Sequence, residues 1–271
     1  MAKECGVPSW VDYDDDIFDI PDSNLSRDTY EHYGWLQQAA ECIRLADIVS
    51  VSTPALERSF RARFGDNLNI RVIPNGFDDF FTRPFFQNDN PRDPARPEIA
   101  YRGSNTHPGD LGIVGDRFAA MSDKHPDWHW TFFGYTPPGA KKIPEQRRMS
   151  APWSANMYVY LANLRACAPD VMFFPLQDHP FNHCKANMCL MEAAWAGAPL
   201  ICPDWEEWRI PGAINYKSEA ECANVIDLVM SGEFDLRARA KESWDWVVSN
   251  RTLTKTNELR KKLIQDLVAL K

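Results

Sequence analysis

Short apolar runs alternate with longer amphipathic segments along most of the chain. The apolar runs of a first series lie at 9–14, 48–53 and 70–75. Those of a second series lie at 98–103, 128–135, 170–176 and 199–204. Helical periodicity separates them, for example over about 30–44, 54–64 and 154–166. This β-α-β order predicts an α/β protein with parallel sheets covered by helices and right-handed crossovers.

The two series predict two Rossmann-like units. We expect a partial N-terminal domain over 1–84, a polar, proline-rich linker over 85–97 and a second α/β domain over 98–250. Amphipathic periodicity over the last residues predicts a closing helix within 251–271.

The segment from Pro180 to Pro199 predicts a donor-nucleotide site. Lys185 and Glu192 lie seven residues apart, which places them on one face of a single predicted helix. A helix N-terminus with a lysine suits a diphosphate, and a carboxylate deeper along the helix accepts hydrogen bonds from sugar hydroxyls. The alternative, a buried helix of small residues in an α/β core, stays open.

Further candidates follow the predicted strands, where ligands bind in open α/β sheets. Arg102 and Gly103 end the predicted strand at 98–103, and Ser104 and His107 follow it. Asn182 lies in the loop before Lys185. A glycine permits close approach, and the polar side chains suit phosphate oxygens.

Four aspartates crowd the end of the first predicted strand, namely Asp12, Asp14, Asp15 and Asp16. Carboxylates in such a pattern hold Mg²⁺ or Mn²⁺ on a nucleotide-sugar diphosphate in some transferases. A solvated loop or a helix cap explains the same pattern, and we expect no metal ligand in the chain.

Composition narrows the classes of function. The chain has 271 residues, a hydrophobic content of 44% and a formal net charge of −8, which disfavours wholesale binding of a nucleic acid backbone. No apolar run reaches the length of about 18 residues that a membrane span needs, and no leader is visible, so a cytoplasmic protein is expected. The seven cysteines are scattered, which predicts reduced thiols in the core.

Two segments resemble the group 1 glycosyltransferases, family four, which have the GT-B fold. The first is ADIVSVSTPALERSF followed by IRVIPNGFDDFF, in which Asn75, Gly76 and Asp78 match a family run. The second is DVMFFPLQDHPFNHCKANMCLMEAAWAGAPLICPD. The family's donor motif has two glutamates. Glu192 matches the second, which holds the ribose in the family, whereas Cys184 stands in place of the first, and Lys185 is expected to approach the phosphates instead.

The resemblance implies an enzyme that transfers a hexosyl or pentosyl group from a nucleotide-diphosphate sugar, with retention and without a bound metal. Strand–helix units that begin the family's first domain are absent, so the fold is expected to be GT-B-like with an incomplete first domain. A homo-oligomer or a partner chain that completes this domain is one consequence, because unpaired edge strands recruit partners.

We expect Lys185 and Arg102 to stabilise the negative charge that develops on the leaving diphosphate. Asp14, Asp15 or His107 is expected to orient the acceptor hydroxyl or to act as the base. The acceptor stays open among a saccharide, a lipid-linked glycan, a protein and a modified nucleic acid base. Rival hypotheses are an inactive nucleotide-binding module, a metal-dependent transferase of the other nucleotide-sugar fold, and a glycosyltransferase that modifies nucleic acid.

Overall fold

The chain folds into two compact units that are discontinuous in sequence. The computed structural model describes residues 6–78 and 95–270. Unit 1 comprises residues 1–79, 179–187 and 250–271, and unit 2 comprises 80–178 and 188–249. The predicted domains were continuous ranges, whereas residues 179–187, which lie within the range predicted for the second domain, belong to unit 1. Most of the predicted linker, 85–94, lies outside the described residues.

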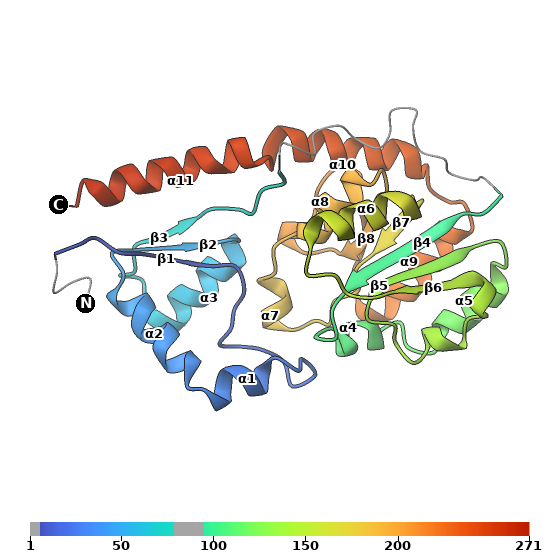
Figure 1. Ribbon diagram of the computed structural model, residues 1–271, viewed down its shortest axis with the longest axis horizontal. Helices are drawn as coiled ribbons and strands as arrows, with labels where there is room; N and C mark the ends of the chain where they lie inside the picture. Colours follow the sequence, from blue (N-terminus) through green and yellow to red (C-terminus); the bar gives the residue numbers. More distant parts are fainter. Residues whose placement is uncertain (1–5, 79–94, 271) are drawn as a thin grey trace. The chain divides into compact units, whose positions relative to one another are not determined.

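Unit 1 contains a parallel sheet in the order β1-β2-β3. Its strands are β1 (Trp10–Tyr13), β2 (Ile48–Val51) and β3 (Ile70–Val72). Its helices are α1 (Arg27–His32), α2 (Trp35–Leu45), α3 (Pro54–Phe64), α7 (Pro180–His183) and α11 (Leu253–Val268) (Figure 1). All four residues of β2 are buried, as expected of the central strand of a parallel sheet.

The helix α3 begins at a clear capping signal. Thr53 is the N-cap, its hydroxyl accepts a hydrogen bond from the backbone N–H of Leu56, and a proline occupies the first turn. The face that α3 buries contains Leu56 and Phe60, which pack with Val49 and Val51 of the sheet. Cys184 belongs to the same core, so the segment after α7 is anchored in unit 1.

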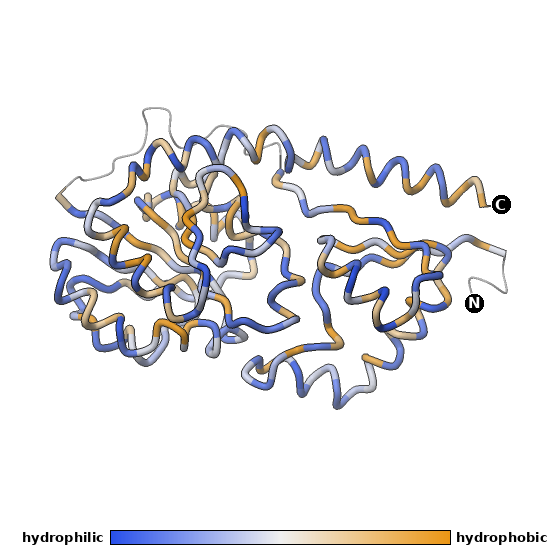
Figure 2. The backbone as a smooth tube through the Cα atoms, turned by 180° about the vertical axis from the view of Figure 1, so that it is seen from behind, coloured by the Kyte–Doolittle hydropathy of each residue, from blue (hydrophilic) through white to orange (hydrophobic). Residues whose placement is uncertain are grey.

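The closing helix also belongs to unit 1. Phe77 donates its backbone N–H to Arg251 and accepts one from Leu253, which fixes the start of α11. A Cβ at Gly76 would lie 2.5 Å from the hydroxyl of Thr256, so the close approach requires glycine. Figure 2 shows hydrophilic and hydrophobic residues alternating along α11, and its residue Leu263 packs with the unit 1 core.

Unit 2 is built on a parallel sheet in the order β6-β5-β4-β7-β8-β9. The strands are β4 (Glu98–Gly103), β5 (His129–Gly134), β6 (Arg148–Ala151), β7 (Val171–Phe173), β8 (Leu200–Pro203) and β9 (Ile214–Tyr216). β5 and then β6 follow on one side of β4, and the next strand in the sequence, β7, pairs with the other side of β4. The carboxyl ends of β4 and β7 therefore form a topological switch point, where ligands of open α/β sheets bind.

Helices and an aromatic core surround this sheet. The helices are α4 (Pro108–Gly112), α5 (Arg117–Lys124), α6 (Met157–Cys167), α8 (Met188–Trp195), α9 (Glu219–Met230) and α10 (Leu236–Asn250). One face of the sheet buries the rings of Tyr101, Trp130, Phe132 and Phe173 with Phe118 of α5. Within the described ranges, none of the helices is both long and apolar enough to cross a lipid bilayer.

Three local predictions were wrong. The helix expected at about 30–44 is two helices, because Gly34 adopts φ +65° between α1 and α2. The edge strand β6 was missed because its half-exposed sequence RMSA carries no apolar run. The helix expected to carry both Lys185 and Glu192 is interrupted between α7 and α8.

The cysteine prediction holds for most of the described thiols. Cys184, Cys189, Cys202 and Cys222 are buried and free, whereas Cys42 is exposed.

Candidate functional site

Arg102, Tyr160 and Glu192 form a buried charged cluster in unit 2, called here the Arg102 cluster. Arg102 Nε donates to Glu192 Oε2 and Nη2 donates to Oε1, each at 2.6 Å, and the hydroxyl of Tyr160 donates to Oε2 at 3.0 Å. Burial alone lowers the pKa of Arg102, but the Glu192 carboxylate more than reverses this, so the pKa lies above its ordinary value. The guanidinium is therefore a fixed positive charge in a bidentate geometry.

The cluster lies at the switch point because Arg102 occupies the carboxyl end of β4. Its side chain is 20% exposed, whereas that of Glu192 is 2% exposed, so Arg102 is the member of the pair that solvent reaches. The next residue, Gly103, pairs in register with Gly134 of β5. A Cβ at Gly103 would lie 2.1 Å from the hydroxyl oxygen of Tyr101. Glycine is thus required on packing grounds at the strand end.

The turn after β4 carries Ser104 and His107. The hydroxyls of Ser104 and Thr106 lie 2.6 Å apart, which orders the turn. His107 Nδ1 lies 2.7 Å from Asp110 Oδ2, and the other oxygen of Asp110 accepts the backbone N–H of Gln177. Asp110 therefore links the loop after β4 to the loop after β7 and fixes the orientation of the imidazole.

A second group of predicted site residues lies in unit 1 at the end of β1, and we call it the Lys185 cluster. Lys185 Nζ lies 3.6 Å from Asp15 Oδ1 and 4.3 Å from the ring centroid of Phe181. Burial and the charge of Asp15 raise the pKa of Asp14. The hydroxyl of Thr53 donates to the carbonyl of Cys184 at 2.9 Å, which holds the segment before Lys185.

The predicted pairing of Lys185 and Glu192 on one helical face is wrong. α7 ends at His183 and α8 begins at Met188, so Lys185 lies in the intervening segment. Lys185 belongs to unit 1 and Glu192 to unit 2. The two residues therefore do not share the face of one continuous helix.

The aspartates at the end of β1 are partly engaged within the protein. Asp12 accepts a hydrogen bond from Ser50, and the fully buried Asp16 accepts one from Ser59. In the described part of the chain, no group of three or more His, Cys, Asp or Glu residues is placed to hold a metal ion.

Asn182 is buried within α7. Two residues that contact predicted site residues, Tyr160 and Asp110, were not themselves predicted. Tyr160 lies on a helix that was expected, but nothing in its neighbourhood marks it as a partner of Glu192. Asp110 follows His107 by three residues, a spacing that brings side chains together in a helical turn, and this signal was available.

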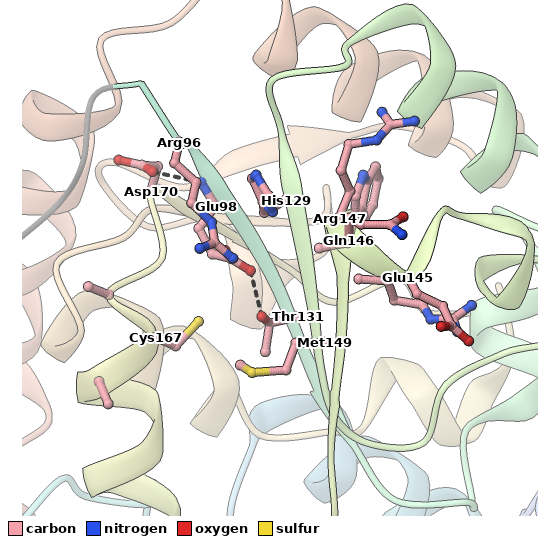
Figure 3. Close-up of a pocket in the computed structure, with 14 residues that line it drawn as sticks. Arg96, Glu98, His129, Thr131, Glu145, Gln146, Arg147, Met149, Cys167 and Asp170 are labelled. Atoms are coloured by element: carbon pink, nitrogen blue, oxygen red, sulfur yellow. Dashed lines mark hydrogen bonds between the residues drawn. The ribbon is translucent and has the colours of Figure 1, made fainter.

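A pocket of about 450 Å³ lies at the opposite, amino-terminal edge of the unit 2 sheet. Its lining includes Glu98, His129, Thr131 and Arg147 (Figure 3). Glu98 accepts a hydrogen bond from Thr131, and its backbone N–H donates to Asp170 at 2.8 Å. Burial raises the pKa of Glu98 to about 7. None of the predicted site residues lines this pocket.

Comparisons with known proteins give no match among family models and none among curated proteins. Solved structures do match. Sucrose-phosphate synthase from Thermosynechococcus elongatus has 18% identity and a TM-score of 0.67, covering 97% of this chain and 69% of that one. A UDP-forming alpha,alpha-trehalose-phosphate synthase from Burkholderia vietnamiensis has 15% identity and a TM-score of 0.64, covering 98% and 70%. A glycosyltransferase from Rickettsia africae has 12% identity and a TM-score of 0.67, covering 98% and 72%.

These similarities extend over both units, and the chain spans about 70% of the length of the matched synthases. Both described sheets are parallel and each is covered by helices, as in two Rossmann-like domains. The described part of the first unit has only three strands, in agreement with an incomplete first domain. The chain therefore has the GT-B fold of these glycosyltransferases, as the family resemblance implied.

Proposed function

We propose that the protein is a glycosyltransferase that moves a hexosyl or pentosyl group from a nucleotide-diphosphate sugar to an acceptor hydroxyl. The observation that carries this proposal is the Arg102 cluster, a fixed guanidinium beside Gly103 at the switch point of unit 2. The shared fold supports it. Among the similar structures, one from E. coli is bound with UDP-2-fluoro glucose and the Burkholderia synthases are UDP-forming.

Arg102 is the proposed ligand of the donor diphosphate. Nε and Nη2 are engaged by Glu192, and the Arg102 side chain as a whole is 20% exposed. Glu192 is then a positioning residue, since it holds the guanidinium in one orientation. Its assignment to the ribose stays a prediction. Gly103 and Ser104 complete the proposed donor contacts by close backbone approach and a hydroxyl.

In the proposed reaction, the bond between the anomeric carbon and the diphosphate oxygen breaks, and its electron pair leaves with the diphosphate. A new bond forms from the acceptor oxygen to the anomeric carbon. Arg102 stabilises the negative charge that develops on the leaving group, and we assign the same role to Lys185. The proton of the acceptor hydroxyl passes to a base, for which Asp14, Asp15 and His107 are the candidates.

Among these three candidates, Asp14 and His107 differ in their surroundings. Burial raises the pKa of Asp14, which is the direction that a general base near neutral pH requires. Asp110 orients the His107 ring through Nδ1, so Nε2 is the ring nitrogen that would contact the acceptor hydroxyl. Retention, membership of family four and independence of metal ions remain predictions from the resemblance.

Hydrolysis of donors tests the proposal without knowledge of the acceptor. UDP-, GDP-, ADP- and TDP-sugars are incubated with the full chain, with and without EDTA, and the released nucleotide diphosphate is measured. We expect release from conjugates of one nucleotide, unchanged by EDTA and reduced in Lys185→Ala. Nucleotide binding without release from any conjugate would favour the inactive binding module instead.

A further inference from the structure

An exposed aromatic platform in unit 1 lies where α1 turns into α2. The rings of Tyr33 and Trp35 stack with centroids 5.2 Å apart and planes at 26°, and Tyr30 packs edge-on against Trp35 at 5.8 Å. Tyr33 is 60% exposed and Trp35 is 44% exposed. Two large rings thus present open surface to solvent, although burial of aromatic surface normally stabilises a fold.

Gly34 creates this arrangement. Its φ of +65° belongs to the left-handed region, which lets the chain reverse within one residue so that Tyr33 and Trp35 stack. A Cβ at Gly34 would meet nothing within 4 Å, so packing does not require glycine here. Glycine is favoured here by its backbone conformation, and that conformation brings Tyr33 and Trp35 into contact.

A polar hollow adjoins the platform. It has a volume of about 570 Å³ and is lined by Asp28, Thr29, Glu31, His32 and Tyr33. Tyr33 belongs to both the hollow and the stacked pair. One oxygen of Glu31 accepts from Arg27 Nε at 2.8 Å, and Arg27 also pairs with Asp22. Asp28 and Glu31 line the hollow, and Arg27 is shared between Glu31 and Asp22. The net charge of this group of side chains is therefore negative.

We propose that the platform binds a neutral saccharide. The C–H face of a sugar ring packs against an aromatic ring, while carboxylate and hydroxyl oxygens beside it accept hydrogen bonds from sugar hydroxyls. Acidic groups repel phosphates, which disfavours a nucleic acid on the same rings. Two rings also cover far less than the roughly 1,000 Å² that a stable protein interface buries.

The inference does not depend on glycosyl transfer, and binding measurements without any nucleotide sugar test it. Isothermal titration calorimetry uses the full chain with cellohexaose, maltohexaose, chitohexaose and mannohexaose as probes. We expect at least one of them to bind, and Tyr33→Ala and Trp35→Ala to weaken that binding about fivefold to tenfold. Trp35→Phe, which keeps a ring, restores part of the affinity.

The matched control is Trp153→Ala, because Trp153 is 55% exposed but lies in unit 2. This variant keeps the wild-type affinity. The proposal is overturned if no probe binds at millimolar concentration, or if binding is unchanged in both Tyr33→Ala and Trp35→Ala. Binding of a single-stranded oligothymidine that depends on Trp35 and exceeds saccharide binding overturns it as well.

Discussion

The carboxylate of Glu192 holds the guanidinium of Arg102 through two hydrogen bonds of 2.6 Å, although 90 residues separate them in the sequence. This pair joins α8 to the end of β4. It therefore couples the stability of unit 2 to the geometry of the proposed donor site.

Removing one partner of this pair should destabilise the protein strongly. Glu192→Ala leaves a largely buried guanidinium without its counter-ion, and we expect a loss of about 2–4 kcal/mol in the free energy of unfolding. Urea denaturation measures it. Glu57→Ala, which breaks the surface pair with Arg61, should cost less than about 1 kcal/mol. Equal losses in the two variants would contradict the burial argument.

A side chain at Gly103 should disturb the end of β4. The added Cβ of Gly103→Ala would overlap the ring of Tyr101, whose Cζ would lie 2.7 Å away. We expect a loss of about 1–3 kcal/mol in thermal or chemical denaturation. Gly112→Ala is the control, because its Cβ would meet nothing within 4 Å and its φ is not positive. Full stability of Gly103→Ala would show that the strand end is not closely packed.

The pocket at the amino-terminal edge predicts a pH dependence of stability. The pKa of Glu98 is raised from 4.5 to about 7 in the fold, so the folded state binds more protons than the unfolded state between these values. Stability therefore falls as pH rises from about 4.5 to about 7, by at most roughly 3 kcal/mol.

Glu98→Gln removes this dependence, because the amide oxygen still accepts from Thr131 but does not ionise. The variant should be more stable than the wild type at pH above about 7 and similar to it at pH near 4.5. Denaturation at a series of pH values measures the difference. A difference in stability that stays constant across the pH series would mean that the pKa of Glu98 is not raised in the folded state.

Thr53 should stabilise unit 1 through two hydrogen bonds of its hydroxyl. Its hydroxyl accepts from Leu56 N–H and donates to the carbonyl of Cys184. Thr53→Val should cost about 1–2 kcal/mol, measured by chemical denaturation. Thr29→Val on the exposed surface of α1 provides the comparison, and an equal effect would argue against the cap.

Strands and most helices could be predicted because apolar runs in a parallel sheet are nearly continuous, as in β2. β6 escaped prediction because an edge strand needs no such run. The break between α7 and α8 could not be predicted from spacing, since Lys185 and Glu192 satisfy helical periodicity whether or not the backbone is continuous. Tertiary contacts, such as the bond from Thr53 to Cys184, decide where the segment belongs.

Arg102 was recognised from its place at the carboxyl end of a predicted strand, which requires no knowledge of its partner. Glu192 was recognised from its seven-residue spacing to Lys185 and its carboxylate chemistry, and the family resemblance added the ribose as its expected ligand. Their mutual contact was not predicted, because no local pattern connects residues 90 positions apart.

The most direct measurement is calorimetric binding of UDP, GDP, ADP and TDP to the full chain and to Arg102→Met/Glu192→Gln. This double variant removes both charges together, so that no buried charge is left unpaired. Arg61→Ala serves as the control. We predict that one nucleotide is preferred, that its affinity falls at least about tenfold in the double variant, and that the control binds normally. Equal binding by the folded double variant, or no binding of any nucleotide by the wild type, would contradict the donor site at Arg102.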